Sequence, residues 1–392
     1  MNCLICGCDE KEVLTKLCSN MNIMGPFFKE KSSYVVACPK CGHVYVDIDA
    51  DQEAFTEYYA SEYSKSLSYF EVFGKDNAEI YYSNIVSRIK KYVDRDGKIL
   101  EIGGGIGELA DFMKQKGFTD ITVMEPSPRC KKLCNQRGIF VIESDAMQLS
   151  QEEKGKYDFI IINHTLEHIL CFDKVLENAR GMLKDDGHMY IEVPDASEYK
   201  NTDFVPYWFF TYEHIFHMGL EGFENLAAAF NYAVTEKKSY LKCKSYYVMY
   251  AIFEKSNKES QIVYLPQTKE DIKAYIKMCE AKLEPVINEL EKSNEAMVLW
   301  GVGTSTAQLL NGNFERCNIK KLIDSNPYRQ NVIYHVAGKD MKIEDPKMIT
   351  EEDGTILILP LMYDASIRKQ IKEMKLKNKV KSLIENYKGK DE

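Results

Sequence analysis

Residues 98–108 read KILEIGGGIGE and join an apolar run to four glycines. Ile99, Leu100 and Ile102 predict a buried strand, and the glycines that follow predict a tight turn. The segment after Glu108 (LADFMK) predicts a helix that starts directly behind this turn. In such a unit the backbone can approach a ligand closely, with N–H groups pointing at it. The stretch therefore predicts a ligand-binding turn in an α/β sheet.

The glycines follow the pattern E-x-G-x-G-x-G and do not fit the G-x-G-x-x-G spacing of a dinucleotide-binding turn. An acid, Glu101, stands two residues before Gly103. S-adenosylmethionine carries a cationic sulfonium and an ammonium group and has no pyrophosphate, so an acid suits this cofactor. We therefore expect Glu101, Gly103, Gly105 and Gly107 to bind S-adenosylmethionine. The alternative for this run alone is a tight turn without a ligand.

The next predicted strands end in polar side chains. Glu125 ends the second strand, 18 positions after Gly107, where a βαβ unit places the acid that binds both ribose hydroxyls. Asp145 ends the third strand, and a carboxylate there can accept a hydrogen bond from an adenine amino group. Asn163 ends the fourth. We expect Glu125, Asp145, the adjoining Ala146, and Asn163 to contact the cofactor; the alternative for the two acids is a solvated strand end.

A fifth strand is predicted at 187–194, and two more within 233–254. A helix over 76–93 leads into the glycine strand. This order resembles the class I S-adenosylmethionine-dependent methyltransferase fold over about residues 80–255. The resemblance implies a Rossmann-like α/β sheet whose carboxyl edge binds the methyl donor.

The composition limits the class of partner. A chain of 392 residues predicts two or three domains, and its net charge of −9 disfavours nucleic acid and anionic membrane surfaces as partners. No apolar run approaches the length of a membrane span, and the N-terminus lacks the pattern of a secretory signal. We therefore expect a cytoplasmic protein that acts on a small molecule.

Two Cys-x-x-Cys pairs lie near the N-terminus, each followed by glycine: Cys3 with Cys6, and Cys38 with Cys41. Four thiolates suit tetrahedral Zn²⁺, and a site closed by four sulfurs leaves no position open for substrate. We expect a structural zinc site in this region. The alternative is two reduced pairs without metal.

Two further segments carry candidate acceptor-side residues. His164 and His168 follow the fourth strand, at the sheet edge where open α/β sheets bind ligands. The aromatic stretch 206–217 (PYWFFTYEHIFH) contains Glu213 and His214, and a glutamate beside a histidine can fix its tautomer or raise its basicity. The alternatives are satisfied histidines at a helix start and chance enrichment in an aromatic crossover.

The last part of the chain repeats the strand–glycine–helix pattern. A polar linker at 255–261 precedes a predicted helix over 268–293, in which Pro285 is expected to produce a kink or a break. Residues 297–303 (MVLWGVG) then predict a second, Rossmann-like set of strands and helices. This half either holds a phosphate of the substrate or only packs on the first half.

The order of these parts resembles the sugar C-methyltransferases that act on nucleotide-linked 4-keto deoxysugars, such as the tetronitrose C3-methyltransferase. The resemblance covers nearly the whole chain and implies that Glu213–His214 is the active-site pair, with His214 as the base. It also matches Tyr63, in the serine-rich lid 62–68, and His168 to family positions. The chain departs from the family at Thr211, where a tyrosine is usual, and it lacks the serine that usually follows the pair.

The resemblance implies four segments: a zinc-binding domain (1–50), an aromatic lid with a lead-in helix (51–95), the methyltransferase domain (96–255) and a C-terminal Rossmann-like substrate domain (256–392). It implies base-assisted enolate formation on a nucleotide-linked keto-deoxysugar, followed by methylation of the enolate carbon. Two alternatives remain open. One is an O- or N-methyltransferase of another sugar-like or surface-glycan metabolite, and the other is a non-catalytic zinc-bearing binding protein.

Overall fold

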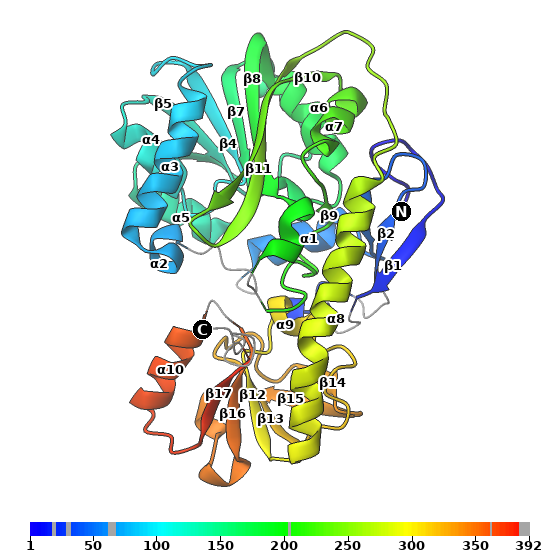
Figure 1. Cartoon of the computed structure of the whole chain (residues 1–392). Coiled ribbons are helices and arrows are strands. Elements are labelled where there is room, and N and C mark those ends of the chain that lie inside the picture. Colours follow the sequence, from blue (N-terminus) through cyan, green and yellow to red (C-terminus); the bar gives the residue numbers. More distant parts are fainter. Residues whose placement is uncertain (18–20, 29–32, 62–67, 203–204, 361–362, 384–392) are drawn as a thin grey trace.

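A computed structural model of the chain describes residues 1–17, 21–28, 33–61, 68–202, 205–360 and 363–383. Three sheets account for its described strands. Two of these sheets are covered by helices and lie at opposite ends of the molecule in Figure 1, and the third belongs to the N-terminal part.

The largest sheet has the strand order β10-β11-β8-β7-β4-β5-β6. The strands from β4 to β8 run parallel, and β11 is antiparallel to both of its neighbours. This mixed order confirms the expected Rossmann-like sheet of the class I methyltransferase fold. Its strands are β4 (Lys98–Ile102), β5 (Asp120–Met124), β6 (Phe140–Ile142), β7 (Tyr157–Asn163), β8 (Leu183–Pro194), β10 (Tyr232–Lys242) and β11 (Tyr246–Lys255).

Helices cover both faces of this sheet because its central strands are apolar on both sides. In β7, Phe159 and Ile161 belong to the core beneath α3 and α4, whereas Ile160 and Ile162 belong to the core beneath α6 and α7. The helical elements are α3 (Lys75–Ile89), α4 (Glu108–Gln115), α5 (Pro128–Gln136), α6 (Phe172–Met182), α7 (Gly222–Phe230), η2 (Gln151–Glu153), η3 (Leu166–His168) and η4 (Ala196–Asn201).

The N-terminal part forms a small antiparallel sheet that includes a strand from the middle of the chain. Its order is β1-β2-β3-β9, and the short β9 pairs with β3 through Val44–His217 and Tyr45–Phe216. The crossover that carries Glu213 and His214 is thereby attached to the cysteine-bearing part. The elements are β1 (Glu12–Lys16), η1 (Met21–Met24), β2 (Tyr34–Ala37), β3 (Val44–Asp47) and β9 (Phe216–His217), followed by α1 (Gln52–Ala60) and α2 (Tyr69–Phe73).

The C-terminal sheet has the order β14-β15-β13-β12-β16-β17 and is parallel except for the β14–β15 hairpin. Its strands are β12 (Met297–Trp300), β13 (Ile319–Ile323), β14 (Ile333–Val336), β15 (Lys339–Glu344), β16 (Thr355–Ile358) and β17 (Val380–Ser382). The associated helices are α8 (Gln267–Ser293), α9 (Thr304–Leu310), η5 (Pro346–Met348), η6 (Glu351–Asp353) and α10 (Asp364–Glu373).

Pro285 does not divide α8, which is one helix of 27 residues. The proline is exposed, and buried residues such as Leu283 and Val286 continue the apolar stripe on both sides of it. Packing of that stripe therefore outweighs the roughly 3 kcal/mol that an interior proline costs.

The helix α8 begins beside the N-terminal part and runs down along the C-terminal sheet (Figure 1). One hydrophobic core joins Phe55 of α1, Phe210 of the crossover, Tyr275 of α8 and Leu299 of β12. The N-terminal part, the crossover and the C-terminal sheet therefore pack as a unit. Among the residues that the structure describes, no helix has both the length and the apolar character needed to cross a membrane.

Candidate active site

A cavity of about 750 Å³ lies between the carboxyl edge of the methyltransferase sheet and the glycine turn that follows β12, which contains Gly301 and Gly303. Its volume falls in the usual range of small-molecule sites, about 300–1,000 Å³. Its lining includes three groups of residues: the turn after β4, the imidazoles of His168 and His214, and residues at the ends of β12 and β13. The site therefore has a methyltransferase end, a middle and a C-terminal end.

The glycine turn depends on backbone conformations that side chains disfavour. Gly103, Gly105 and Gly107 have φ angles of +71°, +53° and +77°. A Cβ atom on Gly103 would lie 2.2 Å from Cγ2 of Thr165, in the turn that follows β7. The hydroxyl of Thr165 donates to the Gly103 carbonyl at 3.3 Å. The two turns therefore pack against each other at the edge of the cavity.

The expected cofactor residues do not all reach the cavity. Glu101, Gly103, Gly105, Glu125, Asp145 and Asn163 line it. Gly107 instead forms the N-cap of α4, where a Cβ atom would lie 2.8 Å from Sγ of Cys134. Ala146 is buried with φ at +62°. These two residues therefore shape the backbone beside the cofactor site.

The acids at the strand ends are already hydrogen-bonded. Glu125 accepts from the backbone N–H groups of Gly105 and Ser127, both at 3.0 Å, and so holds the glycine turn in place. Asp145 accepts from the Thr56 hydroxyl of α1 at 2.8 Å. Each carboxylate thus orders the edge of the cavity through contacts within the protein.

Glu101 is buried, and its Oε2 has no hydrogen-bond partner among the described residues. Burial, reinforced by the nearby charge of Glu125, raises the pKa of Glu101 to about 8. A carboxyl group in this state is mostly protonated at neutral pH, and it ionises more readily when a cation binds beside it. The residue therefore matches the positive charge of a sulfonium cofactor.

Two imidazoles occupy the middle of the cavity. The ring of His168 lies edge-on to that of His214, with centroids 5.0 Å apart. The Nδ1 atom of His168 is 3.2 Å from the hydroxyl of Tyr59. Burial, followed by the proximity of His168, lowers the pKa of His214 to about 4. His214 is therefore a neutral imidazole at neutral pH.

The expected pairing of Glu213 with His214 is not found. The carboxylate of Glu213 accepts from Tyr58 at 2.6 Å and from Thr304 at 3.1 Å, so it joins α1 to α9. Neighbouring residues in this crossover direct their side chains to different partners. Tyr63, the expected lid tyrosine, lies outside the described residues; Tyr58 and Tyr59 of α1 are the tyrosines that contact this part of the site.

Glu167, which is not among the expected site residues, is a carboxylate that lies beside both imidazoles. Its Oε1 lies 3.9 Å from Nε2 of His168, and its backbone carbonyl accepts from Ile215 at 2.6 Å. His164, which has a φ angle of +49°, places Nδ1 3.2 Å from Glu167 and Nε2 3.2 Å from Glu192. The i, i+3 spacing of His164 and Glu167 was the signal available in the sequence.

The C-terminal end of the cavity carries a cation and an acid. Arg329 and Asp324 line it, with Nη1 and Oδ2 3.7 Å apart. The Nε atom of Arg329 is buried without a hydrogen-bond partner among the described residues. Gly301 has a φ angle of +97°, and a Cβ atom there would lie 2.3 Å from Pro360. This turn therefore requires glycine because of its packing.

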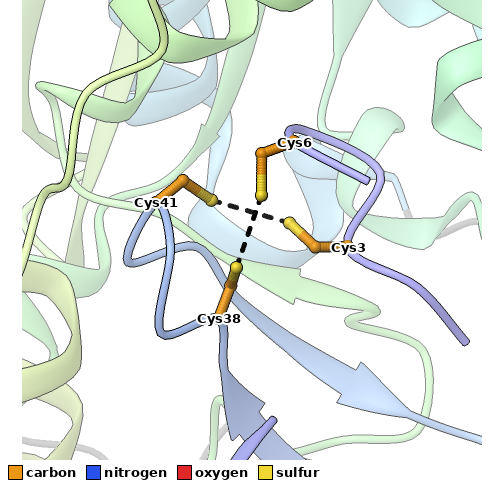
Figure 2. A group of neighbouring side chains, drawn as sticks. All are labelled: Cys3, Cys6, Cys38 and Cys41. Atoms are coloured by element: carbon orange, nitrogen blue, oxygen red, sulfur yellow. Dashed lines mark hydrogen bonds between the residues drawn. The ribbon is translucent and has the colours of Figure 1, made fainter. Parts of the chain in front are cut away.

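The four expected metal cysteines form one cluster (Figure 2). Their sulfurs lie close together, with 3.6 Å between Cys3 and Cys41 and 3.4 Å between Cys6 and Cys38. Four thiolates around Zn²⁺ at about 2.3 Å would have sulfurs about 3.8 Å apart, so the cluster has nearly the required size. The residues present fit a structural zinc ion.

A substitution of Gly103 tests the packing of the glycine turn. Gly103→Ala is expected to lower stability by more than the roughly 1–2 kcal/mol of a left-handed non-glycine residue, because its Cβ also meets Thr165. S-adenosylhomocysteine binding is expected to weaken as well. Gly138→Ala is the control: its φ is +66°, but only the end of Lys114 lies near. Equal losses in denaturant unfolding and calorimetry for both variants would contradict this account.

The pKa of Glu101 predicts a pH dependence. Because the pKa is raised on folding, the stabilisation present at acid pH is lost as the pH rises through about 8 in the ligand-free protein. A bound cation favours the ionised form, so S-adenosylmethionine affinity is expected to rise by up to about tenfold per pH unit below 8. Glu101→Gln should remove both trends in calorimetry and thermal melts. An unchanged pH dependence in this variant would contradict the prediction.

Comparisons with known proteins agree with the central sheet. Residues 76–237 match the profile of a family described as a methyltransferase domain. An uncharacterized protein of Methanocaldococcus jannaschii is 31% identical over 141 residues, which are 36% of this chain. The matched region spans 62% of the length of that curated relative.

Two solved structures are similar to part of the chain. A protein of Pyrococcus horikoshii covers 49% of this chain and 100% of its own, with 18% identity and a TM-score of 0.39. The Burkholderia thailandensis 1,6-didemethyltoxoflavin-N1-methyltransferase, bound to S-adenosylhomocysteine, covers 56% of this chain and 98% of its own, with 12% identity and a TM-score of 0.39. Residues 76–237 thus match a methyltransferase-domain family, and the sheet that they contribute to has the strand order of the class I methyltransferase fold.

Proposed function

We propose that the chain transfers a methyl group from S-adenosylmethionine to a carbon of a nucleotide-linked keto-deoxysugar. The observation that carries this proposal is a single cavity that joins the glycine turn, the imidazoles and the C-terminal sheet. Such a cavity offers one end to the methyl donor and the other end to a long, polar acceptor. The acceptor atom would then lie in the middle, beside His168 and His214.

The chemistry begins with a C–H bond beside a carbonyl group. A base removes that proton, and the resulting enolate carbon attacks the methyl group of the sulfonium. Holding the two reactants in line contributes up to roughly 7–11 kcal/mol in oriented systems. A positioned base adds about 10²–10⁴-fold. In the simplest form of the mechanism the base is the neutral imidazole of His214, and His168 donates to the enolate oxygen.

The proposed nucleotide end of the acceptor lies at the C-terminal sheet. A guanidinium such as that of Arg329 binds phosphate oxygens in a two-pronged geometry, and a strand-end acid such as Asp324 can accept from ribose hydroxyls. Asp324 already accepts from the backbone of Asn326 at 2.7 Å, which fixes its orientation. These contacts support binding of the substrate by this half of the chain, as opposed to a role in packing alone.

We also propose that the cysteine cluster holds Zn²⁺ and supports the active site from a distance. The cluster anchors the loop before β3, and β3 pairs with β9, which begins two residues after His214. A Cβ atom on Gly42, beside Cys41, would lie 2.1 Å from the Leu265 carbonyl, so this loop also packs under the start of α8. Zinc would therefore stabilise the crossover without touching the substrate.

A substitution of His214 tests the catalytic assignment. His214→Ala is expected to reduce turnover by at least about 10²–10⁴-fold, because it removes the group that faces the acceptor. Binding of S-adenosylhomocysteine should persist, since Glu101 and Gly103 are unchanged. Turnover is measured with a panel of nucleotide-linked keto sugars.

Near-normal turnover of this variant with a true substrate would contradict the assignment. Exchange of deuterium from the substrate carbon separates C-methylation from O- or N-methylation, because only C-methylation requires loss of that proton. No binding of S-adenosylmethionine in calorimetry would leave only the non-catalytic binding protein.

Removal of the proposed zinc tests the cysteine cluster. A strong chelator, or Cys38→Ser, is expected to increase hydrogen exchange in residues 1–45 and in β9 while S-adenosylhomocysteine binding persists. Cys8→Ser is the control, because Cys8 lies outside the group of four. A chain that contains no zinc by plasma mass spectrometry would refute the site.

A further inference from the structure

Three ligand-type side chains meet in the middle of the cavity. The side chains of Glu167, His168 and His214 each bring one donor atom within 4.8 Å of the other two. Tetrahedral bonds of about 2.0–2.2 Å to a central ion would place such atoms about 3.4 Å apart. Small side-chain rotations would close the remaining gap. The three residues come from two segments, the turn after β7 and the crossover, which the Ile215–Glu167 backbone bond joins at 2.6 Å.

Two of the three residues have buried polar atoms that lack a partner. Glu167 is 2% exposed, and neither its Oε2 nor the Nδ1 of His214 has a hydrogen-bond partner among the described residues. A buried polar atom left in this state costs free energy of about 1–3 kcal/mol. Such atoms in a ligand-lined cavity point to a missing occupant. A metal ion is an occupant that pairs with both atoms, because it accepts electron pairs from a carboxylate oxygen and from an imidazole nitrogen.

A second layer of contacts orients these residues as in many metal sites. Tyr59 contacts Nδ1 of His168 at 3.2 Å, which leaves its Nε2 directed toward Glu167. His164 contacts Glu167 on one side and the fully buried Glu192 on the other, 3.2 Å from each. The imidazole of His164 thus bridges two carboxylates and is not free to act as a ligand.

We propose that Glu167, His168 and His214 bind one divalent first-row transition-metal ion, with its open coordination face toward the cavity. Two imidazoles and one carboxylate suit Zn²⁺, Fe²⁺, Co²⁺ or Mn²⁺ better than Ca²⁺ or Mg²⁺, which prefer oxygen ligands alone. Three protein ligands leave at least one position open, as in catalytic sites and unlike the closed cysteine cluster. The open position takes an oxygen atom of the methyl acceptor.

The role of this ion rests on the proposed function, and it adds to that function a group that binds the acceptor's keto oxygen. The ion holds the keto oxygen of the acceptor and stabilises the charge that develops there. The ion expands to five ligands and binds a water molecule, which releases a proton to solvent and becomes hydroxide. The adjoining C–H bond breaks, its proton joins this hydroxide to give water, and its electron pair forms the enolate. The enolate carbon then bonds to the methyl group as the S–CH₃ bond breaks and S-adenosylhomocysteine leaves. His214 acts here as a ligand in place of being the base.

The test is a titration of Co²⁺ into the tag-free 392-residue chain, after the cysteine cluster has been saturated with Zn²⁺ and unbound metal has been removed. Calorimetry and visible absorption are expected to show one added site in the wild type. Glu167→Gln and His214→Ala are each expected to weaken Co²⁺ binding by more than tenfold. Glu213→Gln is the matched control, because that carboxylate contacts Tyr58 and Thr304 and should leave Co²⁺ binding unchanged.

Binding of S-adenosylhomocysteine shows that each variant is folded. Absence of Co²⁺ binding in the wild type, or equal binding in all variants, would overturn the metal proposal. Full turnover of wild-type protein in which this second site is empty would overturn its catalytic role. In either case methyl transfer with His214 as base would still stand, so failure of the metal site is distinguishable from failure of the proposed function.

Discussion

The active site depends on the attachment of one crossover across the carboxyl edge of a parallel sheet. After β8 the chain leaves the methyltransferase sheet, and its return is fixed at two points: β9 pairs with β3, and the N–H of Ile215 donates to Glu167 at 2.6 Å. These backbone bonds place His214 opposite the turn that carries His168. Without them the imidazoles would belong to unconnected segments. The N-terminal sheet is thus part of the framework that shapes the cavity, although it contributes no side chain to the chemistry that we propose.

The same arrangement explains why the cavity has three different chemical environments. At the glycine turn, the buried carboxyl group of Glu101 has a pKa near 8 and would be stabilised in its ionised form by a bound cation. In the middle, neutral imidazole and a buried carboxylate face each other. At the C-terminal sheet, Arg329 provides positive charge beside Asp324. A donor with a sulfonium group, an acceptor with a reactive carbon or oxygen, and an anionic tail would each match one of these regions.

The parts of the site that the sequence predicted are those with strong local patterns. The glycine run, the cysteine pairs and the polar strand ends follow from spacing alone, because each reports a local backbone geometry. The sequence could not show which partners Glu213 takes, since adjacent residues need not share them: its carboxylate accepts from Tyr58 and Thr304. Glu167 was missed because its importance arises from a contact between segments about 50 residues apart. The β3–β9 pairing could not be predicted either, since pairing between strands that are distant in sequence leaves little local signal. The β14–β15 hairpin was also not predicted.

The central claim is that the methyl donor binds at the glycine turn with its sulfur facing the crossover. A crystal structure of the full chain with S-adenosylhomocysteine tests it most directly. We predict that the ribose contacts Glu125, that the amino-acid end lies beside Glu101, and that the sulfur points toward His168 and His214. A ligand bound elsewhere, or a sulfur directed away from the two imidazoles, would contradict the account.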